Sequence, residues 1–266
     1  MRLPASALSI AIVVLACTSL VAPAHADDDR FALTASGFHP TSHTRVSADA
    51  GDLRGETLDF EDRFALARKT TRLRLDGMLR LGDRHRLVFN HYDLERRRST
   101  VIDETIRYDG QTFPIDTLVS GRFDFSLSTL SYEYAVVETP SLRVGAQIGA
   151  HWARARIRIR SHGTPIADVH TRAEGGSPAL GLRLLATPGG HWRLGGYVQA
   201  FKADIGNVDA RFTRAGIFAE YRISTHLGAQ LGHDWFKLDA DYAKPSWNGR
   251  LDLVVRGPSA GLTLAF

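Results

Sequence analysis

The chain has 266 residues, with 33 basic and 29 acidic side chains and a formal net charge of +4. This mildly basic charge is not gathered into the long basic tracts of nucleic-acid-binding arms, so it does not indicate a nucleic-acid partner. Beyond the N-terminus, no stretch approaches the roughly 20 apolar residues of a membrane helix, so any membrane crossing must use strands.

The first 26 residues have the organisation of a secretory signal peptide. Arg2 precedes an apolar run from Leu8 to Leu15, and Ala24-His25-Ala26 supplies the small residues of a cleavage site. A membrane anchor is disfavoured because the apolar run is interrupted from Cys17 onward. Lipidation of Cys17 is disfavoured because Leu15, two residues before it, is a poor fit to the small residue usually found at that position. We therefore expect cleavage after residue 26, which leaves residues 27–266 as one exported domain. Because Cys17 is the only cysteine, that domain has no thiol for a disulfide or a metal site.

Alternation of apolar and polar residues is the main structural signal in the rest of the chain. From Leu73 to Leu81 the odd positions are leucine or glycine and most even positions are charged, a period of two that gives a strand two distinct faces. The pattern recurs from Leu142 to Trp152 and from Ala215 to Ile223. Such segments predict ten strands, at about 30–39, 70–81, 85–96, 121–137, 142–160, 174–187, 191–204, 210–224, 226–238 and 250–266.

The links between these strands are of two alternating kinds. Short turns at one end of the strands and long loops at the other are typical of outer-membrane barrels. The sequence therefore predicts an all-β fold, a transmembrane antiparallel up-and-down β-barrel with short periplasmic turns and longer extracellular loops. Tight links lie at 82–84, 138–141, 188–191 and 224–226, and longer polar stretches lie near 40–69, 97–120, 161–173, 205–210 and 239–249.

Residues 40–69 leave the strand number open. Thr57 to Glu61 alternates as well, and this segment either extends the second strand, forms an extra hairpin above the membrane or folds into the lumen. Ten strands are expected, with eight or twelve as alternatives.

The C-terminus is the most specific local feature. Leu262, Leu264 and the terminal Phe266 share one face of the last strand, which resembles the C-terminal signature that the barrel-assembly machinery recognises. Together with the segment Phe31 to Phe38 and the hairpin at 82–86, it makes the chain resemble small OmpW-like and related uncharacterised outer-membrane barrels of Gram-negative bacteria. The resemblance implies a fold and an outer-membrane location, with no catalytic residue and no cofactor. OmpW-like barrels have eight strands and an apolar lumen, whereas this chain predicts ten strands and an arginine-rich lumen.

Four arginines at period two, from Arg154 to Arg160, form the sharpest cluster. Without a bulge they continue the outward face of Leu142 to Trp152 and lie above the hydrocarbon, where guanidinium groups bind lipopolysaccharide phosphates. A bulge near Ala153 would turn them into the mouth of the barrel, where they would attract anions. A third alternative is a structural ladder inside the lumen, in which these arginines pair with acids on neighbouring strands such as Asp124 or Glu174. The predicted phosphate- or anion-binding set is Arg96, Arg97, Arg98, Arg154, Arg156, Arg158 and Arg160.

Two further groups follow from the expected strand faces. Amphipathic rings near strand ends typically anchor a barrel at the headgroups. The membrane-interface aromatics are Trp152, Trp192, Trp235, Tyr221 and Phe266. The expected lumen-lining residues are Arg72, Arg74, Asp76, Arg80, Asp124, Arg143, Arg183, Glu220 and Arg222.

Residues that suggest an enzyme or a metal site are few. The omptin proteases, which are ten-stranded, act through Asp and His groups at the outer rim, and two short acidic patches here invite the comparison. A Ser/His/acid set and a histidine pair flanking a proline are weaker still, and we expect neither an enzyme nor a metal site. These candidates are His233 with Asp234, Asp239 with Asp241, Ser224 with His226 and Glu220, and His39 with His43.

Two classes of function remain open. The first is a narrow channel or small-molecule conduit, and the second is a non-conducting envelope barrel that binds lipopolysaccharide or a surface partner through its basic outer rim. An outer-membrane hydrolase is a distant third. The expected partners are outer-membrane lipid, lipopolysaccharide and, through Phe266, the barrel-assembly machinery.

Overall fold

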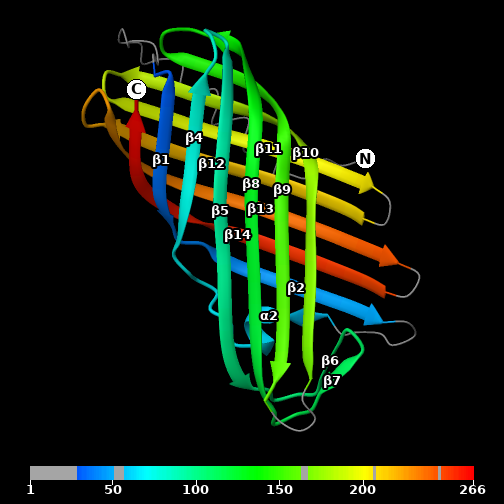
Figure 1. Ribbon diagram of the computed structural model, residues 1–266. Coiled ribbons are helices and arrows are strands. Elements are labelled where there is room, and N and C mark those ends of the chain that lie inside the picture. Colours follow the sequence, from blue (N-terminus) through cyan, green and yellow to red (C-terminus); the bar gives the residue numbers. More distant parts are fainter. Residues whose placement is uncertain (1–28, 51–56, 163–166, 206–207, 245–246) are drawn as a thin grey trace, which may run out of the picture.

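The computed structural model describes residues 29–50, 57–162, 167–205, 208–244 and 247–266. The predicted signal peptide, residues 1–26, lies outside the described residues. The rest forms a closed antiparallel barrel of ten strands (Figure 1), as predicted. Closure comes from β1, which pairs with both β4 and β14. The ten are β1 (Phe31–Phe38), β4 (Arg72–Arg80), β5 (His85–Val101), β8 (Leu118–Glu138), β9 (Leu142–Ser161), β10 (Asp168–Gly189), β11 (Trp192–Ile205), β12 (Val208–Arg222), β13 (Leu227–Lys244) and β14 (Trp247–Ala265).

The two ends of the barrel differ, as the link lengths predicted. At the end near Phe31 and Phe266, here the proximal end, tight turns join the strands. The opposite, distal end carries the hairpin of β6 (Ile106–Tyr108) and β7 (Gln111–Phe113). Much of the polar sequence predicted as long loops is strand instead, because β5, β10, β13 and β14 continue their hydrogen-bonded pairing well beyond the predicted ends. No helix among the described residues is long and apolar enough to cross a membrane.

Residues 41–50 and 58–66 close one side of the distal half. β2 (Thr41–Ala50) pairs with the distal part of β14, and β3 (Leu58–Asp59) pairs with β2. The single turn of α2 (Phe60–Arg63) follows, capped by Asp59, whose carboxylate accepts a hydrogen bond from the Asp62 backbone N–H at 3.2 Å. Residues 58–66, here the inner segment, therefore form a short hairpin with β2 and also fold inward, which combines two of the three alternatives for this region.

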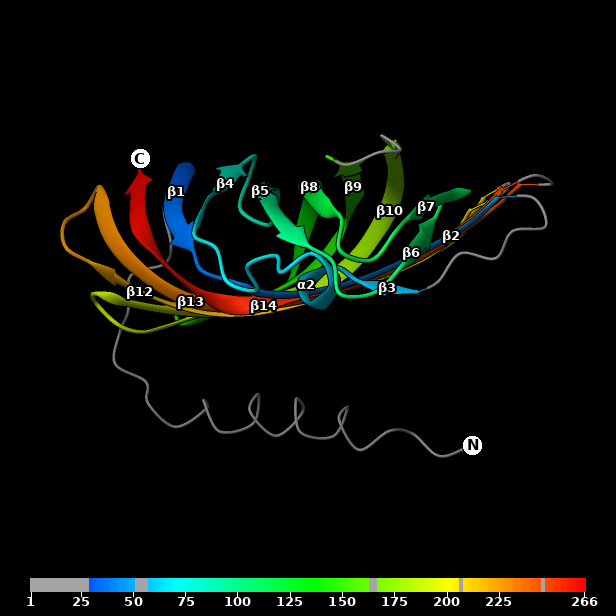
Figure 2. The ribbon, with the colours of Figure 1, turned by 90° about the horizontal axis from the view of Figure 1, so that it is seen from below.

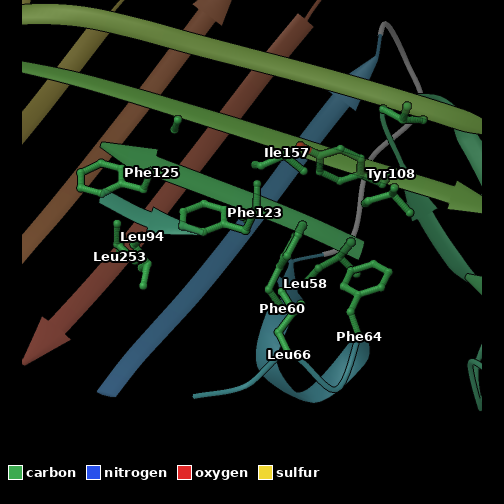
Figure 3. Close-up of a cluster of buried hydrophobic side chains, with 14 of the residues drawn as sticks. Leu58, Phe60, Phe64, Leu66, Leu94, Tyr108, Phe123, Phe125, Ile157 and Leu253 are labelled. Carbon is green, nitrogen blue, oxygen red and sulfur yellow. The ribbon is translucent and has the colours of Figure 1, made fainter. Parts of the chain in front are cut away.

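The inner segment packs into an apolar core between the distal strands (Figure 3). Leu58, Phe60 and Phe64 are fully buried. A Cβ atom added to Gly121 of β8 would lie 2.8 Å from the Phe64 ring, so only glycine leaves room for this packing. The distal half is thus filled with side chains.

The strands exchange their apolar and polar faces half-way along the barrel. On β9, Ile148 and Trp152 point outward and are 59% and 53% exposed, whereas Ile157 and Ile159 point inward and are 5% and 0% exposed. The pairing of β9 with β10 runs from Arg160 to Leu142 without a register shift, so the strand alternates continuously. The proximal half therefore has an apolar outside and a polar lumen, and the distal half has a charged outside and an apolar inside.

In the distal half the barrel divides into two sheets. Asp168 to Ala179 of β10 pairs only with β9, and Phe201 to Ile205 of β11 pairs only with β12. Figures 1 and 2 show β5, β8, β9 and β10 diverging from β11 to β14 and β2. We call the distal parts of these two groups the first sheet and the second sheet. They pack on the apolar core as in a β-sandwich.

Candidate functional site

The proximal lumen holds a network of charged side chains. Arg74 donates hydrogen bonds to Asp234 and, at 2.9 Å, to Asp76. Tyr197 donates to Asp234, and the Arg214 guanidinium lies 3.6 Å from the same carboxylate. Buried carboxylates require such partners. Asp234 is therefore fully engaged, and Arg74 and Asp76 line the lumen as predicted.

Large polar side chains fill the lumen because inward glycines leave them space. Gln147 donates to Glu133 at 2.9 Å and accepts from Gln199 at 2.9 Å, which links β8, β9 and β11. A Cβ atom on Gly145 would lie 2.5 Å from the Glu133 side chain. Arg143, also predicted in the lumen, lies 3.4 Å from Glu133.

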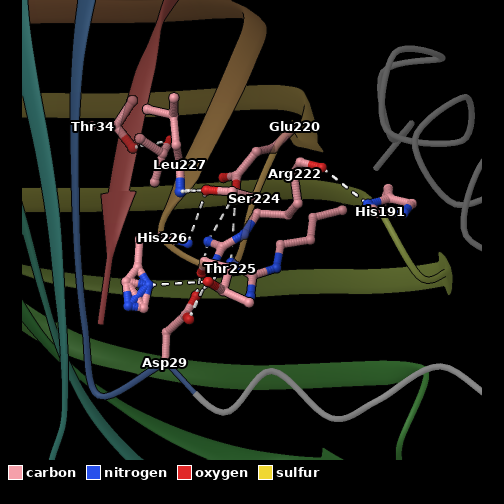
Figure 4. Close-up of polar contacts among 11 residues, drawn as sticks. Asp29, Thr34, His191, Glu220, Arg222, Ser224, Thr225, His226 and Leu227 are labelled. Atoms are coloured by element: carbon pink, nitrogen blue, oxygen red, sulfur yellow. Dashed lines mark hydrogen bonds and ion pairs between the residues drawn. The ribbon is translucent and has the colours of Figure 1, made fainter.

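A second ionic cluster lies at the proximal end of the lumen (Figure 4). Asp29 accepts from Arg222 at 3.1 Å and lies 2.7 Å from Arg193. Glu220 lies 3.5 Å from Arg222 and 3.6 Å from Arg193. Glu220 and Arg222 therefore occupy the predicted lumen, where they pair with each other.

An aromatic layer separates the polar lumen from the apolar core. It consists of Phe38, Tyr92, Phe125, Phe212 and Phe236, which come from five strands, β1, β5, β8, β12 and β13. Tyr92 lies 5.8 Å from Phe38, 6.3 Å from Phe125 and 5.4 Å from Phe236, measured between ring centroids. Phe212 extends the layer, 6.0 Å from Phe236. Within the part of the chain that the structure describes, these rings meet across the lumen and close it.

The outer surface of the first sheet is basic. The arginines from Arg154 to Arg160 point outward, which is the predicted arrangement without a bulge. Their rows continue onto the neighbouring strands, where Arg158 is paired in register with Arg122 and Arg122 with Arg97. We call the shallow pocket that these rows form, with its lining, the basic face. It is lined by Arg97, Arg98, Ser99, Ser120, Gly121, Arg122, Arg158, Arg160 and His162.

Acidic neighbours neutralise only part of this surface. Asp168 accepts two hydrogen bonds from Arg158, at 3.0 and 2.7 Å, which hold the pKa of Asp168 below its usual range. Arg154 pairs with Glu174 at 3.0 Å, an acid that the ion-pair alternative named, but the pair lies on the outer surface and not in the lumen where that alternative placed it. Among the described residues, Arg97 and Arg98 have no ion-pair partner, so the surface keeps an excess of positive charge.

Two predicted positions are wrong. Arg96 points inward, not to the rim, and forms an ion pair with Glu61 in which the side chains are 1% and 0% exposed. Asp124 points outward and pairs with Arg122 at 2.9 Å, because the apolar Phe123 and Phe125 take the inward face in the distal half.

The other predicted arginines lie close to where they were expected, and three members of the basic surface were missed. Arg183 borders the lumen, and Arg72 and Arg80 share the strand face of Arg74. Arg122, His162 and Arg172 belong to the outer surface, and only their outward parity in the strands would have revealed them.

The predicted interface aromatics all lie on the outside of the barrel. Trp192 packs edge-on against Tyr221, with ring centroids 5.1 Å apart, at the proximal end. Phe266 lies at the same end, and Trp152 and Trp235 lie towards the distal half. The apolar outer band is bounded by rings on both sides.

The enzyme and metal candidates have other contacts. Asp239 pairs with Lys237 at 3.0 Å and Asp241 with Arg250 at 2.5 Å. Ser224 accepts hydrogen bonds from the backbone N–H groups of His226 and Leu227, not from the His226 ring (Figure 4). His39 bonds Thr71, and no group of three metal-binding side chains occurs within the described ranges.

Comparison with known proteins identifies the fold. The structure is similar to that of the outer membrane protease OmpT of Escherichia coli, with a TM-score of 0.55, 10% sequence identity and coverage of 88% of this chain and 97% of that chain. It is also similar to the translocator domain of the autotransporter NalP of Neisseria meningitidis, with a TM-score of 0.46, 12% identity and coverage of 91% and 90%. The outer membrane protein OprG of Pseudomonas aeruginosa is similar with a TM-score of 0.43, 11% identity and coverage of 92% of this chain and 99% of that chain.

No protein-family model matches the sequence, and no curated protein matches it significantly. At 10% identity the likeness to OmpT concerns the fold alone. That fold is the outer-membrane β-barrel that the sequence predicted.

Proposed function

We propose that this protein is an integral outer-membrane barrel whose basic face binds the phosphates of lipopolysaccharide, and that it does not conduct solutes. The apolar outer band supports the membrane position. On β9 the outward residues from Leu142 to Trp152 span 11 positions, close to the roughly 9–11 residues of a tilted membrane strand. Comparable apolar side chains, such as Leu180, Ile217 and Leu262, are exposed on neighbouring strands.

The observation that carries the proposal is the position of the arginines relative to this band. Arg154 to Arg160 follow Trp152 directly on the same outward face of β9. Arg158 and Arg160 of the basic face lie six and eight residues beyond Trp152. The basic face therefore lies above the distal end of the band, on the side where lipopolysaccharide phosphates extend from the bilayer. Guanidinium groups bind phosphate through paired, charge-assisted hydrogen bonds, and Arg97 and Arg98 are not engaged by acids among the described residues.

A narrow channel is the second candidate. A polar cavity of about 100 Å³ in the proximal lumen favours it. The aromatic layer and the ion pairs of Asp234 oppose it, because a solute would have to separate both. Recording single-channel currents from the purified barrel in planar bilayers tests this point. We expect a silent barrel, and discrete conductance steps would favour the channel.

Binding to lipopolysaccharide is tested with a triple variant of the basic face, Arg97→Gln, Arg158→Gln and Arg160→Gln. We expect at least about tenfold weaker binding to lipopolysaccharide, which corresponds to about 1.4 kcal/mol. The intact barrel should also prefer native lipid A to dephosphorylated lipid A.

The matched control removes three outward cations from the second sheet, with Arg45→Gln, Lys237→Gln and Arg250→Gln. This control lowers the net charge of the protein by the same amount as the triple variant of the basic face. Equal losses of lipopolysaccharide binding in the two variants would show that binding depends on net charge alone and would contradict a site on the basic face. The assembly machinery remains a proposed partner of the exposed Phe266.

A further inference from the structure

The proximal lumen contains a cavity of about 100 Å³ with charged side chains in its wall, here the lumen chamber. The aromatic layer lies on its distal side, and the ion pair of Arg193 and Glu220 borders it proximally. Because the aromatic layer separates the chamber from the distal half, a ligand would enter past this ion pair from the proximal end, which is the periplasmic end in the proposed orientation.

Cations outnumber acids in the chamber wall. Both wall carboxylates are already engaged, Asp76 by Arg74 and Asn90, and Glu220 by Arg193 and Arg222. Outside the wall, Asp234 engages Arg74 and Arg214, and Asp29 engages Arg193. The positive charge that a bound anion could compensate must therefore come from a wall arginine outside these pairs. The charged wall residues are Arg74, Arg86, Arg183, Arg193 and Arg214 against Asp76 and Glu220.

Arg183 is the wall arginine that lacks a carboxylate partner among the described residues. Its guanidinium lies over the Phe218 ring, 5.7 Å from the centroid. Its register partner on β11 is Tyr197, whose hydroxyl donates to Asp234. The charge of Arg183 is thus free to meet a ligand, while the neighbouring arginines are held in the network.

The chamber also presents an unused hydrogen-bond acceptor. Gln199 is 5% exposed and lines the chamber, and its Oε1 atom has no hydrogen-bond partner among the described residues, although its Nε2 atom donates to Gln147. Gln199 pairs in register with Gly181, two residues from Arg183. Inward side chains at such diagonal positions have Cβ atoms about 7–8 Å apart, so one small ligand can contact both.

We propose that the lumen chamber binds a small oxyanion that also carries a hydroxyl group. Its negative oxygens meet Arg183, and its hydroxyl donates to Gln199 Oε1. Hydrogen phosphate has both groups and a size suited to the chamber. This site is separate from the basic face, because the aromatic layer lies between the chamber and the distal half of the barrel.

Isothermal titration of the purified full barrel with inorganic phosphate, in a chloride background, tests the site. We expect saturable binding that weakens at least about tenfold in Arg183→Gln and largely recovers in Arg183→Lys, since the lysine keeps the charge. Gln199→Leu should also weaken binding, and it leaves the charge of the chamber unchanged. Each variant is first checked for the heat-dependent gel mobility of a folded barrel.

The basic-face triple variant of Arg97, Arg158 and Arg160 separates the two proposals. Chamber binding predicts that this variant takes up phosphate like the unmodified barrel. If phosphate binding is lost in the triple variant and kept in Arg183→Gln, the chamber proposal is overturned and the basic face is supported. An absence of saturable binding at millimolar phosphate overturns the chamber alone.

Discussion

The buried ion pair of Arg96 and Glu61 should hold the inner segment in place. Glu61 also accepts a hydrogen bond from the Thr44 backbone N–H at 2.8 Å, and Arg96 donates to the Thr44 hydroxyl at 2.5 Å, so the pair connects α2, β2 and β5. Removing one member of a buried pair costs about 3–5 kcal/mol, because the other charge stays buried without a partner. Arg96→Met should therefore destabilise the inner segment by about 3 kcal/mol or more.

Limited trypsin digestion measures this effect. Cleavage after Arg63 requires local opening of the inner segment, and 3 kcal/mol raises the open population by about 100-fold or more. We expect rapid cleavage there in Arg96→Met while the barrel stays folded. Cleavage of Arg96→Met at the unmodified rate would show that the ion pair does not hold the inner segment.

A double variant separates the ion pair from general packing. Glu61→Gln with Arg96→Met removes both charges and keeps an acceptor for the Thr44 N–H, so it should be cleaved more slowly than Arg96→Met alone. Arg250→Ala, which removes an exposed pair with Asp241, should leave the digestion pattern unchanged.

Three further predictions concern the other layers. Asp168→Asn should strengthen lipopolysaccharide binding by releasing Arg158. Lowering the pH from neutral to 5 should not have this effect, because the lowered pKa of Asp168 keeps its carboxylate charged at pH 5. Binding titrations of the variant and of the unmodified barrel at neutral pH and at pH 5 check both expectations. Phe236→Ala should lower the free energy of unfolding by about 3–5 kcal/mol in denaturant titrations, since its ring is fully buried in the aromatic layer. Gly145→Ala should cost about 1–3 kcal/mol in the same assay, because the new methyl group displaces Glu133.

The sequence predicted all ten strands because a period of two is visible without knowing what surrounds the strand. It did not predict the inside of the distal half, because alternation distinguishes two faces without saying which one faces the lumen. Within the bilayer the outward face of a strand is apolar because it contacts lipid. Beyond the bilayer the outward face contacts water and is polar, so the apolar face turns inward. Asp124 was misplaced for this reason. The orientation of Arg158 was left open among three alternatives, and the structure has the outward one because the parity of β9 continues through the change.

The rim arginines illustrate a second limit. Adjacent residues of a strand point to opposite faces, so Arg96 and Arg97 lie on opposite faces of β5. Arg98 shares the parity of Arg96 but lies near the end of the strand, is exposed and lines the basic face. Leu94 shares the face of Arg96, and this is the local signal that Arg96 points inward. Its partner Glu61 lies 35 residues away, in a segment whose fold alternation left open, so the pair itself was not predictable.

The order of the layers along the barrel axis favours binding over transport. A solute moving through the lumen would have to separate Arg74 from Asp234 and then displace the rings around Tyr92. Breaking one buried ion pair alone costs about 3–5 kcal/mol, and the rings add the loss of their packing. In an open polar pore, a solute would neither break a buried ion pair nor displace packed rings. The two positively charged sites instead lie on opposite sides of this barrier, so each is reached from its own side of the membrane in the proposed orientation. A ligand at the lumen chamber should therefore leave lipopolysaccharide binding at the basic face unchanged.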